Sequence, residues 1–352
     1  MKAVEGYHHG FLHEFFLFFM KKVYLFARRC YNRTVKKISE RNFTMKISIS
    51  INMQKLELLG GVDAGFAALK EAGFEAIEFA IDPSDLSWDE ICAGKESAVF
   101  TDENLAKIAK ELKEASAKHG IALAQCHAPA PVFVSGKPEG TAQMRKNVNK
   151  ILDFCGECGI PHVVIHPSFD GSARFPKLTR EEEIAENINY YSSIIPLLKK
   201  NHLTCCLENM FSQDWRTKKI FTACCSDMRD SVYYIDTLNE MAGEKCFGFC
   251  LDIGHLLLLG LDAMNAMTTL GDRLTALHIH DNDGVDDLHI EPFSGLTNWQ
   301  RFVKGLRTVG YKGNLNFELG GSWTKIPPEM TPSMLRYVGD TGKYFRDKIL
   351  AE

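Results

Sequence analysis

The stretch LTCCLEN, residues 203–209, alternates between two kinds of side chain. In an extended strand, successive side chains point to opposite faces, so Leu203, Cys205 and Leu207 share one apolar face. The opposite face is small or polar and ends at Glu208. The apolar face suits packing against helices, and the other face suits the inside of a closed barrel whose rim carries a site.

The same division into two faces recurs in other β-branched or apolar runs. It is present in FGFCLD (247–252), LTALHIH (274–280) and NLNFEL (314–319). The run IALAQCH (121–127) fits less well, because Leu123 and Gln125 share the parity of His127. A doubly wound open sheet would bury both faces under helices, so the alternation favours a barrel.

From Met45 onward, eight predicted strands alternate with helices, and several of the helices end at a glycine. The strands are predicted at 46–51, 75–81, 121–127, 162–167, 203–209, 247–255, 274–280 and 314–319. The helices are predicted at 55–72, 102–119, up to Gly159, 180–200, 228–242, 261–271, 297–309 and 331–350. Alternating units of this kind predict a parallel sheet, and eight of them predict an α/β fold of the (β/α)8 TIM barrel type over residues 45–352.

Residues 1–44 differ from the remainder in being aromatic and basic, without the strand and helix period. Lys21 and Lys22 interrupt the apolar stretch and no small-residue cleavage site follows, which argues against a secretory signal. The stretch is too short and too charged to span a bilayer. We expect an N-terminal extension that is not part of the barrel; a basic amphipathic segment lying on a membrane is the alternative.

The composition is that of an ordinary globular protein. The 352 residues carry a formal net charge of −4, with 45% hydrophobic and 24% charged residues, so there is no general attraction to nucleic acid. The chain has eleven cysteines and is long enough to fold without disulfides, which predicts reduced thiols and a cytoplasmic protein. Cys155 and Cys158 match C-x-x-C, but no second pair lies at zinc spacing.

Side chains that can bind metal ions end nearly every predicted strand. They are Glu78, His127, His166, Glu208, Asp252, His255, His278, His280 and Glu318, with Asp287 and His289 in the loop after the seventh strand. In a barrel these positions meet at the C-terminal rim. A single inward histidine is usually structural, but so many converging carboxylates would repel one another without a bound cation.

The mixture of carboxylates and imidazoles narrows the choice of metal. It favours Mn²⁺ or Zn²⁺, with Co²⁺, Fe²⁺ or Mg²⁺ as alternatives, whereas calcium sites use oxygen ligands alone. The run DNDGVDD (281–287) also lacks the order of a calcium loop, since position 290 is isoleucine where a closing glutamate is required. The sequence therefore predicts a transition-metal site at the rim.

The ordered runs CHAP, VIHP, CLEN, LDIGH, LHIHDND, DLH and FEL at successive strand ends resemble the xylose isomerase-like barrel superfamily. Within it they look most like bacterial proteins described as sugar phosphate isomerase/epimerase. The resemblance covers about Met45 to Glu352. Each run alone is weak, but the ordered set is specific for the fold and for a metal site.

The resemblance implies a metal-dependent isomerase or epimerase with one divalent ion. Its ligands would be Glu208, Asp252, His278 and Glu318, with both glutamates also moving the proton. His255 would bind a substrate oxygen. Further substrate contacts are expected from His127, His166, Asn209 and Trp215, the last because aromatic side chains often wall a sugar site.

A second resemblance, to endonuclease IV, implies a zinc phosphodiesterase acting on abasic DNA. That family holds three zinc ions, and all nine of its ligand positions have counterparts in this chain. Beyond the four central ligands, these counterparts are His127, His166, His255, Asp287 and His289. They are therefore candidates for additional metal binding.

Several departures separate the chain from both families. After DLH it continues IEPFSG rather than Gly-Glu-Gly, Glu318 is followed by Leu-Gly-Gly, and no Lys or Arg lies between His278 and Gln300. These features disfavour DNA, whose backbone normally requires several basic residues. Ketose 3-epimerases have an arginine shortly after the histidine of the seventh strand, where this chain has Gly284. This departure disfavours a free-ketose 3-epimerase and leaves an inosose dehydratase-like lyase open. The prediction is therefore a small-molecule carbohydrate substrate, no nucleic acid and a homo-oligomer.

Overall fold

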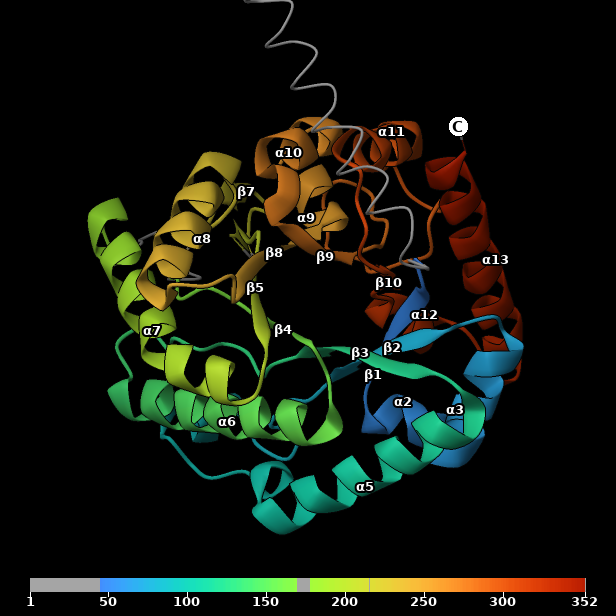
Figure 1. Cartoon of the computed structure of the whole chain (residues 1–352), viewed down its shortest axis with the longest axis horizontal. Coiled ribbons are helices and arrows are strands. Elements are labelled where there is room, and N and C mark those ends of the chain that lie inside the picture. Colours follow the sequence, from blue (N-terminus) through green and yellow to red (C-terminus); the bar gives the residue numbers. More distant parts are fainter. Residues whose placement is uncertain (1–44, 170–177, 215, 352) are drawn as a thin grey trace, which may run out of the picture. The chain divides into compact units, whose positions relative to one another are not determined.

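Eight parallel strands form one sheet that curls into a barrel in this computed structural model, which describes residues 45–169, 178–214 and 216–351. The neighbouring strands follow the order β10-β1-β2-β3-β4-β5-β8-β9 (Figure 1). The barrel strands are β1 (Ile47–Ile51), β2 (Ala76–Ala80), β3 (Ala122–His127), β4 (His162–Ile165), β5 (Thr204–Glu208), β8 (Phe247–Asp252), β9 (Leu274–His278) and β10 (Leu315–Phe317). The predicted (β/α)8 barrel is confirmed.

Helices surround these strands (Figure 1). The longer ones are α3 (Val62–Glu71), α5 (Asp102–His119), α6 (Pro138–Cys158), α7 (Arg180–Lys200), α8 (Met228–Ala242), α10 (Ala263–Leu270), α11 (Trp299–Val309) and α13 (Thr331–Leu350). The short ones are α2 (Met53–Leu58), α4 (Trp88–Cys92), α9 (Ile253–Leu258) and α12 (Gly320–Lys325). Their ends follow local chemistry: a Thr179–Glu182 capping box begins α7, and Gly159 ends α6 in the left-handed conformation.

The single helix predicted over 55–72 is wrong, because the chain forms α2 and α3 there. Gly60 and Gly61, with φ of 92° and 99°, separate the two helices in a conformation that residues with a Cβ rarely adopt. The strands β6 (Phe211–Gln213) and β7 (Ile220–Thr222), which form an antiparallel hairpin after β5, were not predicted, and neither were the short helices α4, α9 and α12. The strand predicted over 247–255 is too long, because β8 ends at Asp252 and α9 begins at Ile253.

The two faces predicted for each strand separate into two cores. The outer core lies between strands and helices and includes Leu207, Leu251, Leu277 and Phe317. A second, small cluster contains only inward side chains of four neighbouring strands, namely Val164, Cys206, Cys250 and Ala276. The barrel interior is therefore filled by small side chains at this level, which leaves its C-terminal end to polar groups.

The misfit of the third strand has a physical cause. The pairing between β2 and β3 shifts register, so that Ile77 lies opposite Leu123 and Glu78 lies opposite Gln125. Because Ala124 is an extra residue in β3, Leu123 packs in the outer core, while Gln125 donates a hydrogen bond to Glu78 inside the barrel. A bulge of this kind cannot be recognised from simple alternation.

The barrel closes between β9 and β10. Ile279 donates its backbone N–H to the carbonyl of Asn316 at 2.9 Å and accepts one from Glu318 at 3.1 Å. On the other side, β10 pairs with β1, with Ile47 opposite Leu315. These bonds bring the end of the chain's last strand beside the ends of β9 and β1.

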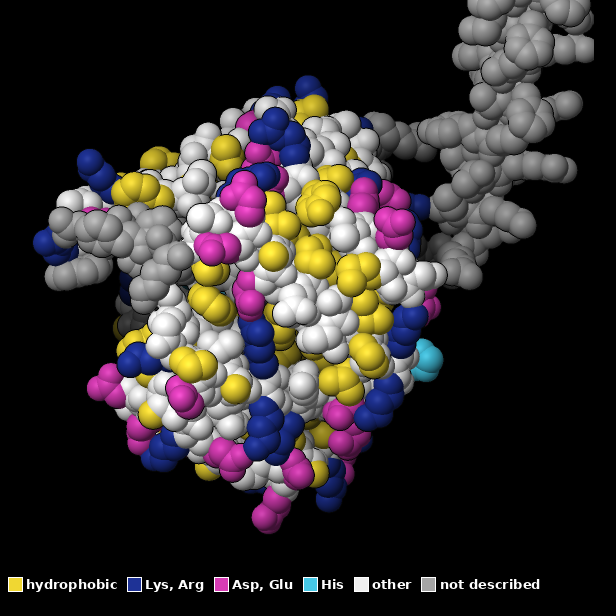
Figure 2. All heavy atoms as spheres, turned by 90° about the vertical axis from the view of Figure 1, so that its left-hand side faces the viewer, with side chains coloured by type: hydrophobic (Ala, Val, Ile, Leu, Met, Phe, Trp, Pro, Cys, Tyr) yellow, Lys and Arg dark blue, Asp and Glu magenta, His cyan; other side chains and the backbone are white. Residues whose placement is uncertain are grey.

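The side of the molecule formed by α6, α7 and α8 carries acidic and basic side chains side by side (Figure 2). One such ion pair joins Lys200 to Asp153 at 2.8 Å. Among the described residues, no helix is both long and apolar enough to cross a membrane, and the ten described cysteines are free thiols. The prediction for residues 1–44 lies outside the described residues.

The aromatic contact of α13 with the barrel provides a test of the core. Phe345 is fully buried, with its ring 5.2 Å from that of Trp299 and 5.4 Å from that of Phe302. Phe345→Ala should lower the free energy of unfolding by about 3–5 kcal/mol, because it leaves a cavity. The neighbouring Tyr344 is 49% exposed, so Tyr344→Ala should cost about 1 kcal/mol or less. Urea denaturation of the two variants would contradict this packing if their losses were equal.

Candidate metal centre

Four ligand-type side chains meet at the C-terminal end of the barrel and form the central group. They are Glu208 at the end of β5, Asp252 at the end of β8, His278 at the end of β9 and Glu318 just after β10. His278 Nδ1 lies 3.1 Å from Glu208 Oε1, 3.2 Å from Glu318 Oε2 and 3.9 Å from Asp252 Oδ2. Glu208, Asp252 and His278 are buried, whereas the Glu318 side chain is 22% exposed. The structure thus brings together the four residues predicted as metal ligands.

Three further groups adjoin the central one. One of them, formed by His127, His278 and Glu318, shares two residues with it. In another, His166 Nε2 lies 3.1 Å from His127 Nε2 and 3.2 Å from Glu208 Oε2. Glu208 therefore belongs both to this group and to the central one.

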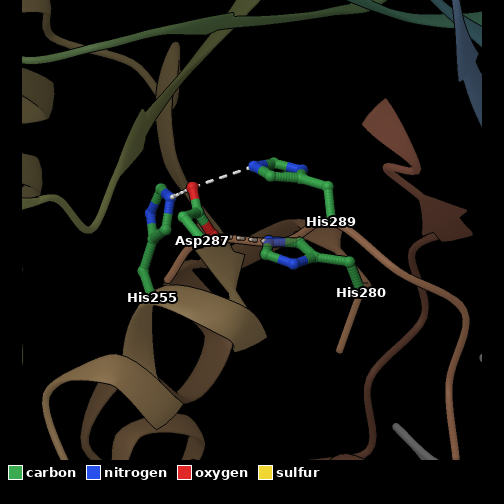
Figure 3. A group of neighbouring side chains, drawn as sticks. All are labelled: His255, His280, Asp287 and His289. Carbon is green, nitrogen blue, oxygen red and sulfur yellow. Dashed lines mark hydrogen bonds and ion pairs between the residues drawn. The ribbon is translucent and has the colours of Figure 1, made fainter. Parts of the chain in front are cut away.

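The other adjoining group, the loop group, consists of His255, His280, Asp287 and His289. Asp287 lies among the three imidazoles (Figure 3), with Oδ2 2.9 Å from His289 Nε2 and 3.4 Å from His255 Nε2. His280 Nε2 lies 2.9 Å from Asp252 Oδ2, so the loop group touches the central group. All five residues predicted for additional metal binding lie in these two groups.

His280 was predicted to lie at the rim among the side chains that can bind metal ions, but it was not assigned to a particular ligand set. Its ring stacks on that of His289 with centroids 3.9 Å apart. Gly254 makes room for it, since a Cβ there would approach His280 Cε1 to 2.0 Å. The available signal was that His280 lies two residues after His278 in the same predicted strand, so that both side chains face the barrel interior.

Glu78 orients His278 from beneath. Its Oε1 lies 2.9 Å from His278 Nε2 and accepts a hydrogen bond from Gln125 at 2.5 Å. Its Oε2 accepts hydrogen bonds from Asn316 at 3.0 Å and from the Ser50 hydroxyl. A carboxylate on the far imidazole nitrogen directs the other nitrogen toward the group, as it commonly does behind metal-bound histidines. Gln125, Asn316 and Ser50 were missed because no local pattern marks them.

Asn209 and Trp215 were predicted to bind substrate. The Asn209 amide donates to the backbone carbonyl of Asp252 at 2.9 Å and accepts from its N–H at 2.8 Å. The backbone carbonyl of Asn209 lies 2.7 Å from His255 Nδ1, and this contact leaves His255 Nε2 facing Asp287. We interpret Asn209 as a residue that positions Asp252 and His255. Trp215 lies outside the described residues.

The charges of the cluster are mutually adjusted. Burial works to raise the pKa of Glu78, but His278, His127 and the Ser50 hydroxyl together outweigh it and lower that pKa to about 2. Burial works to lower the pKa of His127, yet Glu208 and Glu78 raise it to about 10. Similarly, Glu318 and Asp287 raise the pKa of His289 to about 9 against the effect of burial. Without a metal, protons on the imidazoles compensate the carboxylates.

Two carboxylate oxygens indicate that a cation fits these groups. Glu208 Oε2 and Asp287 Oδ1 are buried and accept no hydrogen bond within the described part of the chain. Imidazole nitrogens lie 3.2 and 4.0 Å from them without a hydrogen-bonding geometry. A divalent ion would neutralise these oxygens, and the nitrogen and oxygen donors suit Zn²⁺ or Mn²⁺.

This arrangement defines a (β/α)8 barrel with a metal-site-like cluster of histidines and carboxylates at its C-terminal end. The chain belongs to the xylose isomerase-like TIM barrel family, whose model matches residues 66–338. The resemblance to the xylose isomerase-like barrels is thereby confirmed.

Solved structures of similar fold include sugar epimerases. A D-tagatose 3-epimerase-like protein has a TM-score of 0.60 and 18% identity, covering 87% of this chain and 98% of that one. A D-psicose 3-epimerase, determined in the presence of D-fructose, has a TM-score of 0.60 and 15% identity over 86% and 99%. By sequence, the uncharacterized protein y4fM of Sinorhizobium fredii is 41% identical over 71 residues, which are 20% of this chain and 23% of that protein.

Metal loading should depend on pH. The raised pKa values of His127 and His289 stabilise the metal-free fold below the ordinary histidine pKa of about 6.5, and this stabilisation is lost as pH rises through about 9–10. A metal needs neutral imidazoles, so its affinity should rise between about pH 6.5 and pH 8.5 with release of protons. Titration calorimetry in buffers of different ionisation enthalpy measures both quantities. An affinity independent of pH would contradict protonated imidazoles in the metal-free state.

Glu78 should support metal binding without being a ligand. Glu78→Gln leaves His278 without a charged acceptor and should weaken metal affinity by about 10–100-fold. Glu57→Gln, at an exposed glutamate of α2, is the matched control and should bind metal as the unmodified protein does. The measurements are metal content and calorimetric metal affinity of the Glu78→Gln and Glu57→Gln variants, both with unchanged circular dichroism. Equal affinities would show that Glu78 does not position His278.

Proposed function

We propose that this protein is a divalent-metal-dependent isomerase or epimerase of a small carbohydrate. The observation that supports it is the central group, in which two glutamates from separate strands flank His278 at 3.1 and 3.2 Å. One of them, Glu318, is partly exposed and so is accessible to a ligand. The sugar epimerases among the similar structures agree with this choice, although at their identity they share the fold alone.

Two carboxylates suit proton transfer beside a carbonyl. A divalent ion held by Glu208, Asp252, His278 and Glu318 would stabilise, as a Lewis acid, the negative charge that develops on adjacent substrate oxygens. Glu208 on β5 and Glu318 after β10 approach from strands that are three apart in the barrel order on one side and five on the other. One carboxylate can therefore remove a proton from one face of the substrate while the other returns it elsewhere.

The remaining polar residues would bind and orient the substrate. His127 and His166 lie next to Glu208, where they can hydrogen-bond substrate oxygens and favour the carboxylate form of that glutamate. His255 Nε2 is available on the other side because Nδ1 is taken by the Asn209 carbonyl. Trp215 as a wall of the sugar site, a homo-oligomeric state and a cytoplasmic location stay predictions.

A second candidate is a phosphodiesterase with more than one metal ion, acting on abasic DNA. The overlapping groups favour it, because Glu208 joins two of them and the loop group holds three imidazoles and a carboxylate. Against it stands the stretch 278–300, which contains no Lys or Arg. An inosose dehydratase-like lyase would use the central group alone and remains the third alternative.

The test pairs metal analysis with substrate screens. Protein purified without added metal should contain one dominant divalent ion and should convert a ketose, or a ketose derivative, to an isomer. Glu318→Gln should lower kcat by about 10²–10⁴-fold, because it removes a general acid or base. Glu329→Gln, at an exposed glutamate just beyond α12, is the control.

The screens also distinguish the alternatives. Three zinc ions per chain with incision of an abasic-site duplex would replace the isomerase with the phosphodiesterase. Loss of water from an inosose would identify the lyase. Full activity of Glu318→Gln would contradict the proposed role of this glutamate.

A further inference from the structure

Lys55 is a cation close to the candidate centre that none of the proposed steps uses. It lies in α2 directly after β1, where the Asn52 side chain caps the helix by accepting from the Lys55 N–H at 2.9 Å. The ammonium turns back toward the barrel and donates to the Ser50 carbonyl at 3.3 Å. It also lies 5.6 Å from the centre of the Trp323 ring in α12. Lys55 thus contacts both the end of β1 and α12, the short helix that follows Glu318.

The ammonium is poorly compensated where it lies. Burial lowers the pKa of Lys55, and the carboxylates of Glu318 and Glu78 oppose this effect from a distance. No carboxylate of the described residues forms an ion pair with it, so one long carbonyl contact serves a group with three N–H donors. A partly buried cation that has one long carbonyl contact and no ion pair is incompletely compensated, and an anionic oxygen of a ligand would complete its contacts.

Two donors in α12, the helix whose Trp323 ring lies under Lys55, lack acceptors as well. Ser322 Oγ and Trp323 Nε1 are buried, and neither has a hydrogen-bond partner in the described residues. Ser322 is 2% exposed and Trp323 is 8% exposed. Buried polar groups are normally paired, so two unpaired donors in the helix that contacts Lys55 point to a position for acceptor oxygens.

We propose that Lys55, together with Ser322 and Trp323, binds an oxyanion of the substrate, a phosphate ester or a carboxylate. This inference rests on the proposed function in placing the sugar at the central group, and it restricts the substrate to an acidic sugar. The neutral hydroxyl groups of a plain ketose would leave the ammonium without a counter-charge, whereas phosphate and carboxylate oxygens accept from lysine with charge assistance. Lys55 thus determines specificity by binding the end of the substrate that is distant from the transferred proton.

The experiment measures binding by calorimetry to the full chain loaded with Mn²⁺, so it does not require turnover. Two matched pairs of probes separate the sources of the oxyanion: D-fructose 6-phosphate against D-fructose, and D-galacturonate against D-galactose. The protein should bind at least one acidic probe at least tenfold more tightly than its neutral partner. Lys55→Met should remove this preference and leave metal content and the affinity for neutral sugars unchanged. Lys55→Arg should retain part of it, and Trp323→Phe, which loses only the indole N–H donor, should weaken it.

Lys218→Met is the control for a general change in charge, because Lys218 already has a partner in Asp286 at 2.8 Å. It should keep the preference for the acidic probe. Equal affinity of the unmodified protein for both members of each pair would overturn the inference, as would an undiminished preference in Lys55→Met. Failure of the proposed function is a separate result, namely absence of turnover and of an effect of Glu318→Gln, with the preference for the acidic probe intact.

Discussion

Closure of the barrel between β9 and β10 is the constraint on which the candidate centre depends. The backbone bonds of Ile279 to Asn316 and Glu318 set the register of the last strand. That register places Glu318 3.2 Å from His278, although the two residues are forty positions apart in the chain. If the sheet were open at this edge, Glu318 would have no histidine to face and the central group would lose one of its two glutamates.

The charge of the buried carboxylates is the second constraint: their mutual repulsion destabilises the fold, but the same carboxylates can bind a cation. Glu78, Glu208 and Asp252 are buried in the same barrel end, where carboxylates repel one another. The structure balances them with imidazoles whose pKa values are raised, as for His127. The same balance suits a divalent ion, because a cation can take the place of the protons on the imidazoles in compensating the carboxylates.

Much of this could be predicted from the sequence. Alternation in stretches such as 203–209 predicted the barrel, and the four residues of the central group were predicted as ligands from strand ends together with a family resemblance. The irregular parts could not be predicted. Ala124 forms a bulge that depends on pairing with β2, and the support of His278 by Glu78 depends on strands that are distant in sequence. The use of His280 in the loop group is likewise set by packing against Gly254.

By itself, the sequence determined which side chains can reach the barrel end, because strand periodicity and the order of βα units decide which face and which rim a residue occupies. Tertiary structure alone decided how these side chains divide into groups. It made Glu208 common to two groups, joined the loop group to Asp252 through His280, and left Lys55 without an ion-pair partner among the described residues. The physical reason is that such contacts depend on register and closure, which depend on pairing between strands that no local pattern records.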